Sequence, residues 1–306
     1  MNEKRLLLVG CGGIAKAWVE PGKMINYMKR KIGLIGLGNI GGFYSKTLLK
    51  AGYPLTVFDI DPAKVKTSTD AGANGAANPA DATRASDVII LSLPNSEIVE
   101  DVMLGENGVL QAVNKGQLII DTSTCRPGTA VKLEKLCASK GAGFIDSPLS
   151  WRGPGQILMV GGTEENFKSA EEILKCISYK YRLVGPAGAG QYLKMINQGI
   201  LADRLAVYCE AVELTKKCGM DPMLLKEYLE FDIPDALYSE DYAGGGHLAL
   251  HYKDLGYLNE IAHDVCANIP ISALVHELFK ASKLFGEPHW IQPGIQTYYK
   301  RLNSGG

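Results

Sequence analysis

The sequence predicts an α/β protein in which a doubly wound sheet is followed by an all-helical C-terminal domain. Three observations support this prediction. A glycine-rich turn joins an apolar strand to a helix within residues 32–50, short apolar strands then alternate with helical patterns to about residue 185, and the remaining segments are all helical in pattern. Alternating strands and helices are typical of a parallel sheet covered on both faces. We place the domain boundary near residue 190, which gives a leader of uncertain status (1–28), a sheet domain (29–190) and a helical domain (191–306).

The glycine-rich turn has the spacing of a dinucleotide-binding motif, GxGxxG. It is formed by Gly36, Leu37, Gly38, Asn39, Ile40 and Gly41. The first glycine permits a tight turn, the second lets the backbone approach a pyrophosphate, and the third lets the helix pack on the strand. Asp59 ends the next strand, where a carboxylate can bind the adenosine ribose. The run Asp59-Ile60-Asp61 places two acids and no base beside the ribose, which would repel a 2′-phosphate. We predict a Rossmann-type domain that binds NAD, with NADP less favoured. The alternative is a glycine-rich turn in another kind of α/β protein.

Composition excludes several other classes of protein. The chain has 306 residues, a net charge of −1 and 46% hydrophobic residues, which is ordinary for a globular protein. The sequence has no basic run that would predict binding to nucleic acid or to a membrane surface. It also has no apolar run long enough to predict a membrane span. The seven cysteines are scattered without a CxxC pair, which favours reduced, buried thiols in a cytoplasmic protein and no metal site.

The first 28 residues contain a second glycine turn, GCGGIA at residues 10–15. Two such turns this close together cannot both begin complete strand–helix–strand units. We therefore expect either an appended leader or a true start at Met24 or Met28.

Each further element follows from a local pattern. The first helix, 39–50, ends before Gly52, which favours a helix C-terminus. The continuously apolar segment 87–93 predicts a strand buried on both faces, and Asn95 after it can cap the next helix. In order, strands are expected at 54–58, 87–93, 117–121, 143–146, 157–160 and 181–184, and helices at 62–69, 81–85, 96–102, 127–140 and 164–177.

After the flexible joint GPAGAGQ at 185–191, one long helical pattern extends over 191–218. Much of its apolar surface comes from Ile196, Ile200, Leu205, Val207, Ala211 and Leu214. Further helices are expected at 222–229, 234–242, 247–266, 270–284 and 293–302.

Lys194 and Asn197 are the strongest catalytic candidates. They lie three residues apart on the long helix, hence on one face, just after the joint. A lysine held beside a nicotinamide can exchange a proton with a substrate hydroxyl, and the asparagine can orient the lysine or the substrate oxygen. By spacing alone, the alternative is a lysine on a solvated helix face.

Taken together, several motifs resemble the β-hydroxyacid dehydrogenase family. They are GLGNIGG (36–42), SLPNSEIVEDV (92–102), DTSTCRPGT (121–129), DSPLS (146–150), MVGG (159–162), GPAGAGQYLKMINQ (185–198) and YKDLGYL (252–258). They span most of the chain in the family's order. The resemblance implies a dimer or tetramer built through the helices, with Lys194 as the acid/base and Asn197 assisting. It also implies that Leu93 and Pro94 line the cofactor cleft, that Thr124 lies at the nicotinamide ribose, and that Lys253 reaches cofactor or substrate.

The departures from the family concentrate at the substrate. Ser150, Trp151 and Arg152 stand where the family usually has Ser-Gly-Gly, and the segment that follows is shorter than usual. Glycines let backbone N–H groups approach a carboxylate, which these side chains do not reproduce freely. One hypothesis is that Arg152 binds the substrate carboxylate while Trp151 narrows the pocket. The alternative is a surface arginine in a remodelled loop.

These observations predict an NAD-dependent oxidoreductase acting on a small β-hydroxy acid or the matching semialdehyde or keto compound. The alternatives are a reductase of imines or non-acid carbonyl compounds, which the presence of Lys194 disfavours, and a non-catalytic nucleotide-sensing or assembly protein. His247 and His251 have a spacing that can bind a metal, but no third ligand is apparent and packing or pocket lining is favoured.

Overall fold

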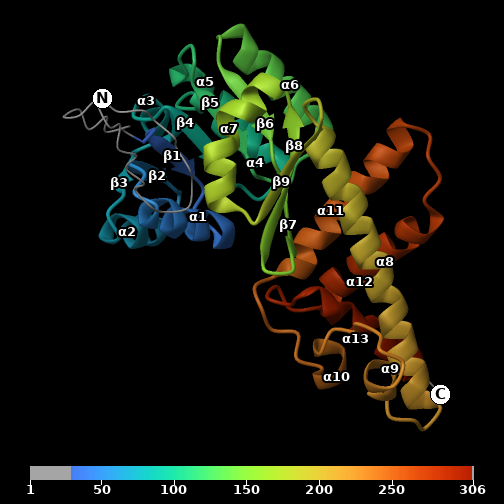
Figure 1. Ribbon diagram of the computed structural model, residues 1–306. Helices are drawn as coiled ribbons and strands as arrows, with labels where there is room; N and C mark the ends of the chain where they lie inside the picture. Colours follow the sequence, from blue (N-terminus) through green and yellow to red (C-terminus); the bar gives the residue numbers. More distant parts are fainter. Residues whose placement is uncertain (1–28, 305–306) are drawn as a thin grey trace, which may run out of the picture.

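The computed structural model describes residues 29–304, and the leader predicted at 1–28 lies outside this range. Figure 1 shows a lobe built on a sheet and a lobe of helices, with the long helix α8 (Ala189–Lys217) extending from the first into the second. This architecture confirms the predicted fold class. The boundary near residue 190 falls in the first turn of α8 and stays a prediction.

The sheet of the described residues has nine strands in the order β3-β2-β1-β4-β5-β6-β8-β7, with β9 also paired to β8. The first six are parallel to one another, and all of them except β3 match strands that the apolar patterns predict. The far edge differs, because β8 is antiparallel to both β6 and β7. The strands are β1 (Ile32–Ile35), β2 (Leu55–Phe58), β3 (Asn74–Gly75), β4 (Val88–Leu91), β5 (Leu118–Asp121), β6 (Gly143–Asp146), β7 (Leu149–Arg152), β8 (Gly155–Gly162) and β9 (Lys180–Gly185).

Helices cover both faces of this sheet. On one face α1 and α7 contribute buried residues such as Tyr44 and Leu174 to a single core cluster. On the other, α4 and α6 contribute residues such as Met103 and Leu133 to a second cluster. The helices of this lobe are α1 (Asn39–Lys50), α2 (Pro62–Asp70), α3 (Pro79–Arg84), α4 (Ser96–Leu104), α5 (Val109–Ala112), α6 (Pro127–Ser139) and α7 (Glu164–Ile177). Asn95 caps α4 as predicted, accepting a hydrogen bond from the Ile98 N–H.

The second lobe packs around α8, whose buried face includes Met195, Leu205 and Val212. Its other elements are α9 (Leu224–Glu227), α10 (Ala236–Ser239), α11 (His247–Asp264), α12 (Pro270–Phe285), the 3₁₀ helix η1 (Gln292–Ile295) and α13 (Gln296–Asn303). The helices predicted at 222–229 and 234–242 are single turns, and the one at 293–302 begins as a 3₁₀ turn. Short helices are marginal in water, so tertiary packing decides how far these segments extend.

Two compositional expectations can be compared with the described residues. The cysteine prediction is wrong in part: Cys125, Cys137 and Cys209 are buried, whereas Cys218 and Cys266 are exposed. Both exposed cysteines lie in the segments that follow a helix, and such connecting segments usually run over the protein surface. Between residues 29 and 304 no helix combines the length and the apolar character needed to cross a bilayer.

Candidate active site

The glycine turn between β1 and α1 has the geometry that a pyrophosphate needs. Gly36 has φ of +92°, and a Cβ there would lie 2.3 Å from the Ser92 carbonyl oxygen. A Cβ on Gly41 would lie 1.9 Å from the Gly36 carbonyl oxygen, so α1 can pack here only with glycine. A Cβ on Gly38 would meet no atom within 4 Å, and no side chain caps α1. The first N–H groups of α1 therefore face open space that fits a phosphate.

Asp59 closes this turn from the end of β2. Its carboxylate accepts hydrogen bonds from the Leu37 N–H at 2.6 Å and from the Asp61 N–H at 2.8 Å. Ile60 is 93% exposed beside it. Two acids and an aliphatic side chain thus surround the position where the adenosine ribose binds in folds of this type.

A cleft of about 260 Å³ lies next to the turn and between the two lobes. Besides Lys194, it brings together six of the residues predicted from the sequence: Ile40, Leu93, Pro94, Thr124, Trp151 and Lys253. Lys194 lines it too, from the first turns of α8, and is only 8% exposed. The cleft is also lined by residues that the sequence analysis did not assign to a cofactor or substrate, among them Gln198, Leu250, Asp254 and Gln292.

Two predicted substrate residues contact each other beside the cleft without lining it. The Asn197 side-chain amide donates to the Ser150 hydroxyl at 3.3 Å, which joins α8 to β7. Trp151, 55% exposed, lines the cleft and packs edge-on against Phe43 of α1 at 6.1 Å between ring centroids. The backbone of Arg152 pairs with Gly155 in the β7–β8 hairpin, and its side chain lies outside the described part of the structure.

The beginning of α8 is fixed by buried polar contacts that position Lys194. Asp146, at the end of β6, accepts from the Gly188 N–H at 2.7 Å and the Gln191 N–H at 3.0 Å. The Gln191 side chain accepts from the Cys125 N–H and donates to the Ser123 carbonyl, both at 2.9 Å. Lys194, three residues after Gln191, is thereby held against the loop that carries Thr124. The motifs DTSTC and GQYLK contain these residues, but the sequence did not indicate that Gln191 would bond to the loop at 123–125.

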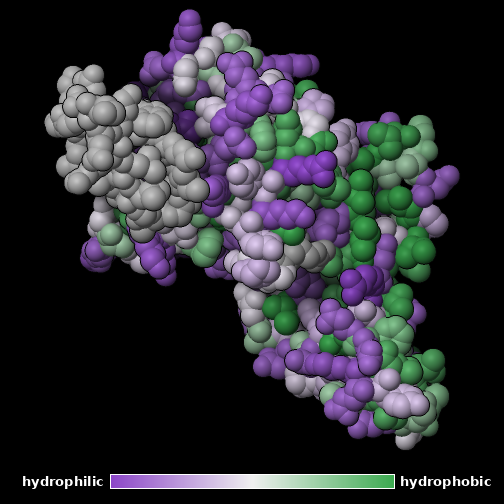
Figure 2. All heavy atoms as spheres, viewed as in Figure 1, coloured by the Kyte–Doolittle hydropathy of each residue, from purple (hydrophilic) through white to green (hydrophobic). Residues whose placement is uncertain are grey.

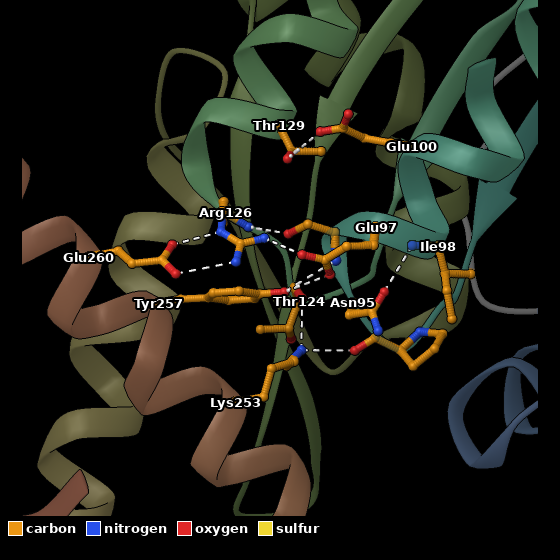
Figure 3. Close-up of polar contacts among 12 residues, drawn as sticks. Asn95, Glu97, Ile98, Glu100, Thr124, Arg126, Thr129, Lys253, Tyr257 and Glu260 are labelled. Carbon is orange, nitrogen blue, oxygen red and sulfur yellow. Dashed lines mark hydrogen bonds and ion pairs between the residues drawn. The ribbon is translucent and has the colours of Figure 1, made fainter.

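Four further contacts connect α11 to the cleft. Lys253 donates from Nζ to the Pro94 carbonyl at 2.8 Å and the Thr124 carbonyl at 3.0 Å, as Figure 3 shows. Gln198 donates to the Asp254 carboxylate at 2.7 Å, and the His251 ring contacts the Gln198 carbonyl at 2.9 Å. In this way α11 carries one cation to the two loops that follow β4 and β5.

Burial shifts the pKa of several groups around the cleft. Loss of solvation raises the pKa of the Asp121 carboxyl to about 7 and that of the Asp146 carboxyl to about 6. The same cause lowers the pKa of His251, so that its ring is neutral near pH 7 and donates Nε2–H to the Gln198 carbonyl. Within residues 29–304 no group of three or more His, Cys, Asp or Glu side chains is arranged to hold a metal ion.

Comparison with known proteins agrees with this arrangement over nearly the whole described chain. Residues 31–185 match the model of the NAD binding domain of 6-phosphogluconate dehydrogenase. Residues 188–290 match the model described as NAD-binding of NADP-dependent 3-hydroxyisobutyrate dehydrogenase. The chain belongs to the β-hydroxyacid dehydrogenase family. It is therefore an NAD(P)-dependent oxidoreductase, which confirms the predicted family, enzyme class and cofactor.

Individual relatives match most of the length of this β-hydroxyacid dehydrogenase. The mitochondrial 3-hydroxyisobutyrate dehydrogenase of Mus musculus is 34% identical over 82% of this chain and 82% of its own. The 2-(hydroxymethyl)glutarate dehydrogenase of Eubacterium barkeri is 34% identical over 84% of this chain and 90% of its own. Among solved structures, the Mycobacterium tuberculosis 3-hydroxyisobutyrate dehydrogenase with L-serine superposes with a TM-score of 0.79 at 25% identity, covering 89% of this chain and all of that one.

Proposed function

We propose that this protein is an NAD-dependent dehydrogenase that transfers a hydride between nicotinamide and the hydroxyl carbon of a small β-hydroxy acid, or the matching semialdehyde. The observation that carries the proposal is the buried position of Lys194 in the cleft beside the loops containing Pro94 and Thr124. The mouse and Eubacterium relatives are named for substrates of this kind. The acids Asp59 and Asp61 flanking the exposed Ile60 favour NAD over NADP, because they would repel a 2′-phosphate.

In the proposed mechanism, bound nicotinamide supplies the hydride acceptor or donor. Lys194 takes the hydroxyl proton during oxidation and returns it during reduction, so that charge does not accumulate on the reacting oxygen. Asn197, held by Ser150, orients the lysine or the substrate oxygen. Leu93, Pro94 and Trp151 line the cleft beside Lys194.

Replacing Lys194 with Ala tests this proposal. We expect kcat to fall by about 10²- to 10⁴-fold, the usual contribution of a positioned acid/base, while NADH still binds. The assay measures NAD⁺ and NADP⁺ reduction, and NADH oxidation, on short hydroxy acids, aldehydes and keto acids, with NADH binding titrated separately. Undiminished turnover in the variant would contradict the role of Lys194. A wild-type protein that binds NADH but turns over no acid substrate would favour a non-acid carbonyl substrate or a sensing role.

Arg152 is the proposed ligand of the substrate carboxylate. The contact of Ser150, on the same strand, with the substrate candidate Asn197 supports this. We expect Arg152→Ala to raise KM for the acid substrate about tenfold or more, because a charge-assisted hydrogen bond is lost. The substitution Arg182→Ala on β9 serves as a control for removing an arginine. An unchanged KM in the Arg152 variant would eliminate this role.

A further inference from the structure

One face of α11 contacts both loops that border the nicotinamide end of the cleft. Lys253, Tyr257 and Glu260 are spaced by four and three residues, which places them on that face. Lys253 bonds the carbonyls of Pro94 and Thr124. One turn further along, the Tyr257 hydroxyl accepts a hydrogen bond from the N–H of Ser96 at 3.3 Å.

Arg126 completes this contact from the loop after β5. Its guanidinium donates to both carboxylate oxygens of Glu260, at 2.6 and 3.2 Å, and to Glu97 at the start of α4. It also lies 4.4 Å from the centroid of the Tyr257 ring. Figure 3 shows the guanidinium between the two carboxylates and beside the tyrosine ring, with Lys253 below. We call Arg126, Glu97, Tyr257 and Glu260 the clasp.

The charges of the clasp make the arginine decisive. Glu97 and Glu260 come from different lobes, and both carboxylates approach the same guanidinium. Without that cation, two negative side chains would face each other across the junction and repel. The Arg126 backbone N–H also donates to the Ser96 hydroxyl at 2.8 Å, so the clasp joins the loop after β4 to the loop after β5.

We propose that Arg126 is a positioning residue for cofactor binding: it holds α11 against the two loops so that Lys253 keeps their carbonyls, and hence the nicotinamide end of the cleft, in place. The inference rests on the proposed role of Lys253 in the cofactor site. It does not depend on the substrate or on proton transfer by Lys194. The geometry supports it because Lys253 and the clasp contact the same pair of loops through one helix face.

A double-mutant cycle on NADH binding tests the proposal. Dissociation constants are measured by nicotinamide fluorescence for wild type, Arg126→Met, Lys253→Met and the double variant, with thermal unfolding recorded for each. We expect Arg126→Met to weaken NADH binding about fivefold, the scale of a partly exposed ion-pair network. In the Lys253→Met background the same substitution should have little further effect, because the group it positions is gone. Arg84→Met, which removes the ion pair with Asp81 on α3, is the matched control and should leave NADH binding unchanged.

The outcomes separate this inference from the proposed function. Fold-changes that multiply in the double variant, or unchanged binding in Arg126→Met, would overturn the positioning role while leaving the dehydrogenase proposal intact. Unchanged binding in Lys253→Met would overturn both the cofactor role of Lys253 and the route through it. If Arg126→Met fails to fold, Glu260→Gln replaces it, since it weakens the link to α11 and keeps the contact of Arg126 with Glu97.

Discussion

Single residues in this protein gain their chemistry from where the strands end. Asp121 ends β5 and is fully buried, with one carboxylate oxygen accepting from the Ser123 N–H at 2.9 Å. Asp146 ends the neighbouring strand and accepts from the first residues of α8. Both carboxylates hold the loops that shape the cleft, although neither lines it. Burial is what raises their pKa values.

The raised pKa of Asp121 predicts a pH dependence of stability. The folded protein keeps this proton up to about pH 7, whereas the unfolded chain releases it near pH 4. Between these values the folded state binds more protons, so this group's contribution to stability falls as pH rises. Asp121→Asn keeps an oxygen for the Ser123 N–H and cannot ionise. From pH 5 to pH 8, we expect the unfolding free energy of this variant to rise relative to that of wild type by on the order of 2 kcal/mol.

Urea unfolding of both proteins at the two pH values measures this difference. The charge of Asp146 is one cause of the raised pKa of Asp121, so the comparison reports the coupled pair of carboxyls rather than Asp121 alone. An equal difference in unfolding free energy at pH 5 and pH 8 would show that Asp121 is already ionised when buried.

At the scale of elements, the beginning of α8 connects the catalytic candidate to the sheet. Gln191 is fully buried and supplies both a donor and an acceptor to the backbone of the 123–125 loop. Gln191→Ala would leave a buried N–H and a buried carbonyl without partners. We expect a loss of about 1–3 kcal/mol in unfolding free energy, together with a fall in kcat because Lys194 lies on the next turn.

Denaturant unfolding and steady-state kinetics test this prediction, with Gln111→Ala on the exposed side of α5 as the control. The control should change stability by less than about 0.5 kcal/mol. A Gln191 variant that is destabilised but turns over at the wild-type rate would show that this anchor does not position Lys194.

At the scale of the whole molecule, α8 exposes an apolar stripe opposite its buried face. Ile196, Ile200, Val207 and Leu214 are spaced by four and seven residues and are all more than half exposed. Figure 2 shows hydrophobic residues gathered on the side of the molecule where α8 lies in Figure 1. Contiguous apolar surface of this kind is typical of protein–protein interfaces. It supports the predicted homodimer or homotetramer.

We expect the wild-type protein to be a dimer or tetramer and Ile200→Asp to shift it toward the monomer. A charge at the middle of the stripe would have to lose its water on association, which is unfavourable without a partner. Light scattering after size-exclusion chromatography measures the mass. Tyr179→Asp, an exposed aromatic position in the sheet lobe, is the control and should leave the mass unchanged. A wild-type monomer would contradict the predicted oligomer.

Local patterns were sufficient to predict most of the fold. Apolar runs, glycine turns and capping residues act within a few neighbours along the chain, so they identified β1, α1, the parallel strands other than β3, and the long α8. Segments with weak local signals were missed or misjudged: the two-residue β3, the single turn α5, and β7, whose antiparallel pairing with β8 depends on contacts across the hairpin. Shortened helices after α8 have the same cause, because tertiary packing decides how far a marginal helix extends.

For the site, the sequence by itself determined the dinucleotide turn, the acid at the end of β2, and the candidacy of Lys194. Each depends on residue type at a fixed spacing within one element or motif, whereas the candidacy of Lys253 came only from the resemblance to the family. Only the tertiary structure decided that Gln191 ties Lys194 to the loop after β5, that Asn197 meets Ser150, and that Arg126 lies between carboxylates from both lobes. Those contacts join residues from about 30 to more than 130 positions apart in the chain. No local spacing specifies such contacts, because they form only when distant parts of the chain have folded and packed together.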